Sequence, residues 1–520
     1  MIKNQNYFVF ARRGEVTINE GVVDFPILLE AKEDIKSNFE SYTILGEQCS
    51  PMKIKIGSEE LSVWESENFF IVRDSPDFIL RSGKAVKHIL EVKRKLGPSK
   101  LLYFPGISDP YLIPTFFLLG VDVFDDINAI LEGINKTRYT MYGRMRNEND
   151  CQESNVEFIR MELSLLKKAV DDGTLYNIVE RLNISPKNTE MLRHLSTKHY
   201  EVFESNFPRY TPKILAGSLD SILRPDVKRF NNYVSNDYRK GNNADVALFI
   251  PCSAKKPYSS SKSHKRLIEA IRPFRNGIHE IILTSPISTV PRDLEDTYPP
   301  KFYDIPVTGT WYAEEKQNIR NVLTNYLKNN TYKHLIFFLP EDMNFVQDFN
   351  FSNSLFIQWN KSKSDEFAEL IDTLREIQPA NKEKRDFLKE KLTSIASYQF
   401  GNWIKPYLSE MRVTRMFNQF MLTLSGKPQF ILNEEIGKLT IHKDAGKIFI
   451  GARKFLVEID DFKPTSNIYA MGVISCSEEI RQGDEVVVHH SGEIRGVGIA
   501  RMSSAQILQN KKGVAVKMRN

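Results

Sequence analysis

Three short apolar runs, each ending at a proline inside a polar loop, constrain the fold of this chain more than any other feature. They are ALFIPCS from residue 247, IILTSPIS from residue 281 and LIFFLPED from residue 335, and an amphipathic stretch at 313–327 between the last two predicts a helix. Helical crossovers make such strands parallel, and α/β folds place ligands at the carboxyl ends of parallel strands. We therefore expect Cys252, Ser285 and Pro340 to meet at one edge of a parallel sheet.

The loop after the first run carries an unusual set of polar side chains. Pro251 ends the run, and Cys252, Lys256 and His264 follow before an apolar-periodic helix begins near residue 267. Cationic groups and helix N-termini lower the pKa of a thiol from about 8.5, which favours a nucleophilic thiolate at Cys252. His264 is a group that can move protons near neutral pH. Two other interpretations stay open: Cys252 as a buried core residue, and the serines and lysines as a phosphate-binding loop.

Length and composition limit the remaining choices. With 520 residues the chain should form three or four domains of roughly 150 residues each. Neither a signal peptide nor an apolar run of about 18 residues is visible, so we expect a cytoplasmic protein with no membrane partner. The four cysteines form no CxxC pair, which argues against a disulfide framework and a zinc ribbon. The net charge of +5 is compatible with a polyanionic partner without requiring one.

Strand and helix signals alternate in the first two hundred residues. Residues 83–96 and 110–119 predict helices, and 100–104 and 121–124 predict strands. The segments LLYFPGISDP and LGVDVFDD resemble the end of the barrel of tRNA-guanine transglycosylases, in which the nucleophilic aspartate matches Asp125. Because about 205 residues are too few for a full barrel of roughly 250, we expect a degenerate barrel on which the helical stretch 157–181 packs.

The departures from the transglycosylases matter for the expected chemistry. Of that family's CxCxxC zinc site only Cys151 remains, so we expect no zinc and no other cofactor. The family's DSGGFQ loop, which carries its first catalytic aspartate, is absent, and Asp74 and Ser75 are only a faint match to it. An active transglycosylase that uses Asp125 remains an alternative.

The second half of the chain changes character twice. Polar, turn-rich residues near 205–243 are typical of a linker, and residues 363–436 are helical and then mixed, as in an adapter domain. The last eighty residues form short strands separated by glycines, which indicates a small β-barrel. Their segments KDAGKIFIGARKFL, IRQGDEVVV and VGIARMS resemble the PUA domain, an RNA-binding module. The phosphate-binding candidates are Arg453, Lys454, Arg481 and Arg495.

The loop at Cys252 carries the most specific resemblance. The segment PCSAKKPYSSSKSH is similar to the pattern P-C-x3-K-P-Y-x2-S-x2-H of archaeosine synthases at every position. The resemblance implies a tRNA-modifying enzyme that adds an amine to the nitrile of 7-cyano-7-deazaguanine in the D-loop of tRNA, forming an amidine. The amine donor is lysine or glutamine, and a radical SAM partner subunit completes archaeosine. A non-catalytic tRNA-binding scaffold is the remaining alternative.

The resemblance assigns expected roles to named residues. Cys252 would attack the nitrile, and Lys256 or His264 would protonate the nitrogen. The candidates for substrate binding are Tyr258, Ser261, Ser285, Pro286 and Asp125. A homodimer is left open.

Taken together, the sequence predicts a multidomain α/β and α+β protein. Its expected parts are a degenerate TIM-barrel-like domain at 1–205, an α/β core with a parallel sheet at 206–360, a small α+β adapter at 361–437 and a PUA β-barrel at 438–520.

Overall fold

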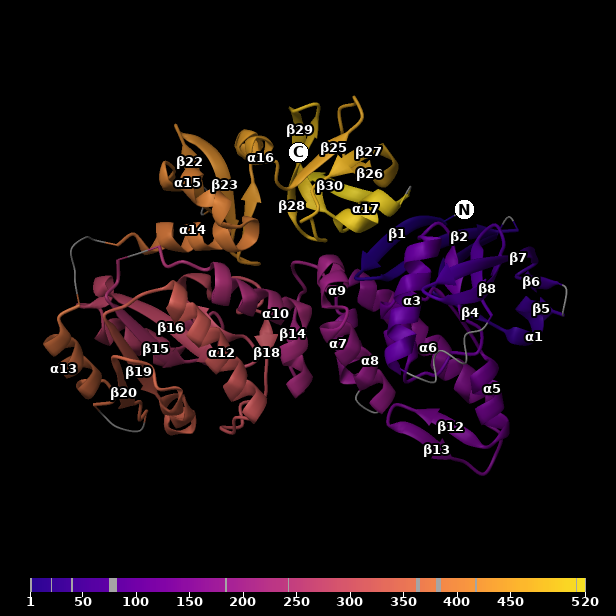
Figure 1. Cartoon of the computed structure of the whole chain (residues 1–520), viewed down its shortest axis with the longest axis horizontal. Coiled ribbons are helices and arrows are strands. Elements are labelled where there is room, and N and C mark those ends of the chain that lie inside the picture. Colours follow the sequence, from indigo (N-terminus) through magenta and orange to yellow (C-terminus); the bar gives the residue numbers. More distant parts are fainter. Residues whose placement is uncertain are drawn as a thin grey trace. The chain divides into compact units, whose positions relative to one another are not determined.

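The computed structural model describes residues 2–19, 21–38, 41–73, 82–182, 185–241, 243–361, 365–379, 385–416, 419–510 and 512–519. The chain divides into two compact units (Figure 1). Unit 1 contains residues 1–212 and 454–520, and unit 2 contains residues 213–453. Asp74 and Ser75 lie outside the described residues.

The largest sheet of unit 1 is half parallel and half antiparallel. Its strand order is β4-β11-β10-β9-β8-β7-β6-β5. The parallel strands are β4 (Ile27–Leu29), β11 (Val123–Asp125), β10 (Leu101–Tyr103) and β9 (Phe69–Val72). The antiparallel strands are β8 (Glu59–Glu65), β7 (Glu47–Ile56), β6 (Tyr42–Ile44) and β5 (Ile35–Ser37).

The expected degenerate TIM barrel is therefore not confirmed. The local alternation was predicted correctly, because α3 (Ser82–Leu96), β10, α4 (Ile113–Leu118) and β11 follow one another as expected. The antiparallel half arises from hairpins, which need only short turns in place of crossover helices. A separate three-stranded antiparallel sheet is formed by β1 (Ile2–Phe8), β2 (Ala11–Ile18) and β3 (Gly21–Phe25).

Helices complete the N-terminal part of unit 1. The predicted helical stretch 157–181 forms two helices, α6 and α7, whose buried side chains join one apolar core with those of α3 and α4. These two helices are α6 (Gln152–Asp171) and α7 (Leu175–Arg181). The other elements are α1 (Ala31–Asp34), α5 (Ile127–Ile134), α8 (Pro186–Thr197), α9 (Tyr200–Asn206) and the hairpin of β12 (Thr137–Thr140) and β13 (Gly143–Arg146).

The C-terminal part of unit 1 contains the short strands that the glycine-separated runs predicted, and they form one six-stranded sheet. Its order is β26-β30-β29-β28-β25-β27, with α17 (Ser504–Gln509) between the last two strands of the sequence. The strands are β25 (Leu456–Ile459), β26 (Asn467–Tyr469), β27 (Val473–Cys476), β28 (Glu485–His490), β29 (Glu493–Ala500) and β30 (Val514–Arg519).

Unit 2 is built on the parallel sheet that the three apolar runs predicted. The runs form β15 (Val246–Pro251), β16 (Ile278–Thr284) and β19 (His334–Leu339), and β15 pairs in parallel with both neighbours. The predicted helix at 313–327 is α12 (Ala313–Asn329), which buries Ile319, Leu323 and Tyr326. The sheet also has two edge strands, the antiparallel β17 (Ser288–Pro291) and the parallel β20 (Ser354–Gln358).

The segment expected to be a linker is instead structured. It contains β14 (Ile214–Leu215), which pairs with β18 (Tyr303–Asp304), and α10 (Pro225–Asn232). Its aromatic side chains are core residues: Phe230 and Tyr233 both contact the ring of Tyr398, at centroid distances of 5.3 and 5.0 Å. Their polar neighbours in sequence concealed this burial.

The rest of unit 2 combines helices with a four-stranded antiparallel sheet. The sheet contains β21 (Arg412–Met416), β22 (Gln419–Leu424), β23 (Lys427–Asn433) and β24 (Lys438–Ile441). Because β24 pairs with β23, it belongs to unit 2, which extends to Arg453. The helices are α11 (Lys262–Ala270), α13 (Ala368–Ile377), α14 (Phe387–Phe400), α15 (Lys405–Ser409) and α16 (Gly446–Ala452).

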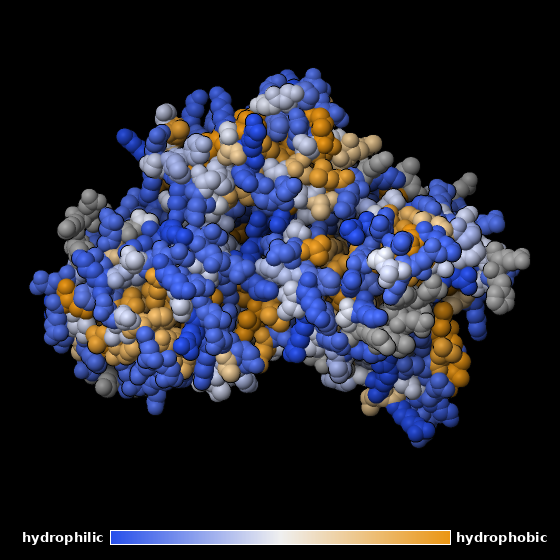
Figure 2. Space-filling view, viewed as in Figure 1, coloured by the Kyte–Doolittle hydropathy of each residue, from blue (hydrophilic) through white to orange (hydrophobic). Residues whose placement is uncertain are grey.

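The face of the molecule in Figure 2 is mostly hydrophilic, with smaller apolar patches. Over the ranges that the structure describes, no helix is long and apolar enough to cross a membrane.

Candidate active site

Cys252 lies at the carboxyl end of the central strand of unit 2. All residues of β15 are buried, and the backbone N–H of Cys252 donates to the carbonyl of Leu283 at 3.2 Å, which extends the β15–β16 ladder by one residue. Cys252 itself is a partly exposed free thiol. The strand thus holds the backbone of this cysteine rigidly while its side chain stays accessible.

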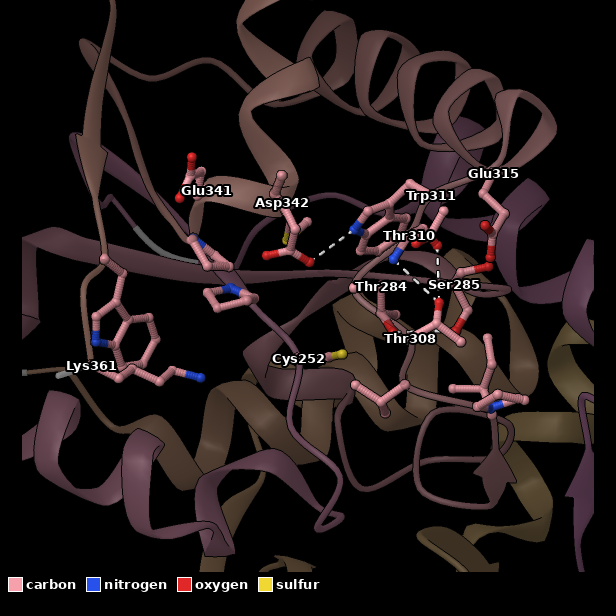
Figure 3. A pocket seen from close by; sticks show the side chains of 18 of the residues that line it. Cys252, Thr284, Ser285, Thr308, Thr310, Trp311, Glu315, Glu341, Asp342 and Lys361 are labelled. Carbon is pink, nitrogen blue, oxygen red and sulfur yellow. Dashed lines mark hydrogen bonds between the residues drawn. The ribbon is translucent and has the colours of Figure 1, made fainter.

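The thiol opens into a cavity of about 470 Å³ (Figure 3). Cys252 from β15, Ser285 from the end of β16 and Pro340 from the end of β19 all line it, which confirms that these three residues meet at one sheet edge. A cavity of this volume is in the range of small-molecule sites. The remaining walls come from the segments after β18, β19 and β20; they include Thr308, Thr310, Trp311, Glu341, Asp342, Trp359 and Lys361.

A buried cluster of hydroxyl groups adjoins the thiol. The hydroxyl of Tyr303 lies 2.9 Å from that of Tyr258 and 2.5 Å from that of Thr284. Burial is the larger cause, and the charge of Cys252 the smaller one, that raises the pKa of the Tyr303 hydroxyl above its ordinary value. A side-chain hydrogen bond joins Tyr303 and Cys252. Tyr303 was not predicted, because it stands 51 residues after Cys252 and its position depends on the pairing of β14 with β18 and on these hydroxyl contacts.

Lys256 is the cation next to this cluster. Its Nζ lies 3.8 Å from the centroid of the Tyr303 ring, and the side chain is half-buried. Burial lowers the pKa of Lys256, while the charges of Cys252 and Asp304 act in the opposite direction. An ammonium group with a lowered pKa gives up its proton more readily than that of a free lysine.

His264 is held in the neutral form by its neighbours. It is fully buried, its Nε2–H donates to the carbonyl of Pro251 at 3.0 Å, and its Nδ1 accepts from Arg292 at 2.9 Å. Burial and the positive charge of Arg292 lower the pKa of His264 to about 3. Because both ring nitrogens are engaged, this geometry favours a positioning role for His264 over proton transfer.

Arg292 connects the histidine to a buried group of charges. It donates to Glu280 and Glu295, both at 2.8 Å, and Glu295 accepts the backbone N–H of Ser259 at 3.0 Å. Although burial alone would raise it, Arg292 and Arg275 lower the pKa of Glu280 to about 2. The network therefore joins β16, the loop at Ser259 and the first turn of α11 to the end of β15.

The other candidates for substrate binding have different surroundings. Ser261 caps the N-terminus of α11 by accepting the backbone N–H of His264 at 3.3 Å. The carbonyl of Pro286 accepts from the side chain of Asn318 at 3.1 Å, and Tyr258 is fully buried behind the cavity. Among the five candidates, Ser285 lines the cavity.

Asp125 belongs to unit 1. Its buried carboxylate accepts from the backbone of Gly106 at 2.7 Å, the hydroxyl of Tyr103 at 3.1 Å and the backbone of Ile127 at 3.1 Å. Burial raises the pKa of Asp125, and these hydrogen bonds oppose the shift. These hydrogen bonds connect Asp125 to the loop after β10 and to the start of α5, and its predicted contact with substrate stays a prediction.

The potential metal ligands among the described residues do not gather into a metal site. No group of three or more His, Cys, Asp or Glu side chains in the described ranges could hold a metal ion. The Sγ of Cys151 is buried and accepts from the side chain of Asn147 at 2.9 Å.

The four predicted phosphate-binding residues fall into two pairs. Arg453 and Lys454 are exposed. Arg481 is paired with Glu204 at 3.1 Å, and Arg495 is paired with Asp461 at 2.7 Å. The cationic groups of the first pair are therefore the more accessible ones, and Lys454 forms a long ion pair with Glu479 at 3.9 Å.

Comparison of the sequence with known proteins identifies the family of this chain. The chain is 41% identical to archaeosine synthase subunit alpha of Thermoplasma acidophilum over 519 residues, which cover 100% of both chains. The chain belongs to the archaeosine synthase subunit alpha family. It is also 28% identical to archaeosine synthase subunit alpha of Methanosarcina acetivorans over 92% of this chain and 84% of that protein.

The chain is also similar to a more distant protein, and two of its segments match domain families. The chain is 22% identical to tRNA-guanine(15) transglycosylase of Methanothermobacter thermautotrophicus, over 84% of this chain and 69% of that protein. Residues 461–520 match the PUA domain, and residues 227–376 match a domain of unknown function (DUF5591). The second match contains β15, Cys252 and every residue that lines the cavity.

Proposed function

We propose that this chain modifies tRNA in archaeosine formation, by adding an amine to the nitrile of 7-cyano-7-deazaguanine to give an amidine. The observation that carries the proposal is the position of the Cys252 thiol, which lies at the carboxyl end of a parallel strand and opens into a cavity of about 470 Å³. Lysine is the proposed amine donor. The Thermoplasma relative is called subunit alpha, and we assign the later conversion to archaeosine to a radical SAM partner subunit.

The first step uses the thiolate as a nucleophile. The Cys252 sulfur attacks the nitrile carbon, one π pair of the C≡N bond moves to nitrogen, and the ammonium of Lys256 protonates that nitrogen. The product is a covalent thioimidate between tRNA and enzyme. Covalent catalysis of this kind divides one difficult addition into two easier steps.

The second step releases the sulfur. The donor amine attacks the thioimidate carbon, the carbon–sulfur bond breaks, and Lys256, now neutral, accepts the surplus proton of the amine. A nitrile and an amine have then become an amidine, so the reaction needs no oxidant, water or nucleotide. The lowered pKa of Lys256 supports its use first as acid and then as base.

The PUA domain supports tRNA as the substrate. A match to an RNA-binding module over residues 461–520, in a chain whose relative is named archaeosine synthase, is consistent with a tRNA partner. The exposed cations Arg453 and Lys454 are the proposed phosphate contacts.

Nucleoside mass spectrometry tests the proposal directly. Purified protein is incubated with tRNA that carries the nitrile, together with lysine or glutamine, and the digested nucleosides are analysed. We expect a lysine amidine with the wild type and no product with Cys252→Ala. A matched control is Cys476→Ala, which removes another partly exposed thiol and should leave the yield unchanged. Wild-type yield from Cys252→Ala would refute the covalent mechanism.

A further inference from the structure

The cavity at Cys252 has two chemically different ends. Hydroxyl groups of Thr284, Ser285, Thr308 and Thr310 line one end, and Glu341, Asp342 and Lys361 line the other. In Figure 3 the sulfur of Cys252 lies between them, with Lys361 and Glu341 on one side and the hydroxyl groups on the other. Glu315 also lies on the hydroxyl side in Figure 3, where its carboxylate accepts the backbone N–H of Tyr312 at 2.9 Å. The hydroxyl end thus offers donors and acceptors that suit a nucleobase, whereas the other end, which carries both Asp342 and Lys361, suits a ligand with charges of both signs.

Asp342 is oriented but not neutralised. One carboxylate oxygen accepts from the indole Nε1 of Trp311 at 3.2 Å, and Figure 3 shows the carboxylate above Cys252. Among the described residues, neither Asp342 nor its neighbour Glu341 forms a salt bridge, although both are exposed. The indole therefore fixes the carboxylate while leaving its negative charge available to a cation.

Lys361 carries the opposite charge and lies against the buried ring of Trp359. Its Nζ lies 4.8 Å from the centroid of the Trp359 ring, and its side chain extends toward the cavity in Figure 3. Trp359 is 2% exposed, donates its indole N–H to Glu366 at 3.0 Å and stacks on Phe338. These contacts fix the ring, against which the Lys361 ammonium group lies beside the cavity.

We propose that this charged end selects the amine donor by its α-amino acid group. Asp342 binds the α-ammonium, Lys361 binds the α-carboxylate, and the aliphatic chain then carries the terminal amine to Cys252. The inference rests on the proposed function and adds the residues that read the donor. Charge-assisted hydrogen bonds to both ends discriminate against simple amines, which lack one or both of the charged groups.

Three donors separate the two contacts. Lysine carries both groups, 6-aminohexanoate lacks the α-amine, and cadaverine lacks the carboxylate. We expect Asp342→Asn to raise the KM for lysine by about tenfold to a hundredfold, with little change in kcat, and to leave the KM for 6-aminohexanoate unchanged. Lys361→Met should raise the KM for lysine similarly and leave the KM for cadaverine unchanged.

A separate measurement of the first half-reaction distinguishes this inference from the proposed function. Without any amine, the thioimidate between Cys252 and tRNA should form equally fast in the wild type, Asp342→Asn and Lys361→Met. Failure of the wild type to form it would overturn the proposed function itself. Normal adduct formation with the same ratio of lysine to 6-aminohexanoate KM in Asp342→Asn and the wild type would overturn only the donor site.

Two further results complete the test. Glu314→Gln, which removes an exposed acidic side chain outside the cavity lining, should leave all three KM values unchanged. Weaker tRNA binding by Lys361→Met, with an unchanged KM for lysine, would assign Lys361 to a phosphate of the RNA and refute its proposed role.

Discussion

Lys256 is the residue whose charge controls both proposed steps. Its half-buried ammonium lies against the Tyr303 ring, and burial lowers its pKa. The acid form is therefore lost at a lower pH than for a free lysine, so the first step should slow as the pH rises through this lowered pKa. The base form appears over the same range and favours the second step.

Replacement of Lys256 by arginine should separate the two steps. Arginine keeps the positive charge but does not deprotonate, so the Cys252 adduct should still form and its rate should lose the alkaline decline. Transfer to the amine should fall about 10²-fold or more, as expected for loss of a general base. Rapid-quench measurement of adduct and amidine from pH 6 to 10 tests this. Equal losses in both steps would contradict the assignment.

The position of Cys252 at a strand end could be predicted from the sequence, whereas several of its neighbours in the cavity could not. Cys252 stands directly after an unbroken apolar run, so its place at a strand end follows from local pattern alone. Asp342 and Lys361 come from two other segments, which the folded sheet brings to the cavity. Tyr303 comes from a third segment and meets Tyr258 and Thr284 in the folded chain. His264 was expected just before a helix and lies in the first turn of α11, and its protonation depends on burial and on Arg292, which is 28 residues away.

At the scale of elements, the buried side chain of His264 links α11 to the end of β15. His264 connects the first turn of the helix to the carbonyl that ends the strand, and Arg292 holds the ring in place. The histidine stays neutral in the folded protein down to about pH 3. In the unfolded chain it takes up a proton below about pH 6.5.

This difference predicts how stability depends on pH. The contribution of His264 is fully present above about pH 6.5 and is lost as the pH falls toward 3, with a slope of at most about 1.4 kcal/mol per pH unit. His264→Gln should remove this component of the slope. Urea denaturation of both proteins between pH 4 and 7, followed by tryptophan fluorescence, measures it. Identical slopes would show that the ring does not titrate differently in the two states.

The same scale explains which elements were predicted and which were missed. Continuous apolar runs identified β15, β16 and β19, and helical periodicity identified α12 to within two residues. The edge strands β17 and β20 were missed because they are short and their pairing depends on neighbours distant in sequence. In unit 1 the local β/α alternation was correct, but local pattern could not reveal that β5 to β8 add antiparallel strands to the same sheet.

At the scale of the whole molecule, the basic side chains of the C-terminal region differ in what they can do. Arg481 and Arg495 have side chains only 14% and 11% exposed, and acidic partners neutralise both. Arg453 and Lys454 are exposed, and the one ion pair of Lys454, with Glu479, is long at 3.9 Å. An ion-paired arginine can bind a phosphate only by giving up its present partner, whereas an open cation binds it without that loss.

Salt dependence distinguishes the two pairs. Each phosphate contact releases counterions and adds about 0.7 to 0.9 to the slope of log K against log salt concentration. The double variant Arg453→Ala, Lys454→Ala should therefore bind tRNA more weakly and reduce this slope by about 1.4 to 1.8. Arg495→Ala is the matched control and should leave the slope unchanged, because its charge is already balanced by Asp461. Filter binding from 50 to 400 mM salt gives both slopes. An unchanged slope in the double variant would move the tRNA contacts to another surface, and a reduced slope in Arg495→Ala would mean that RNA displaces Asp461 from its arginine.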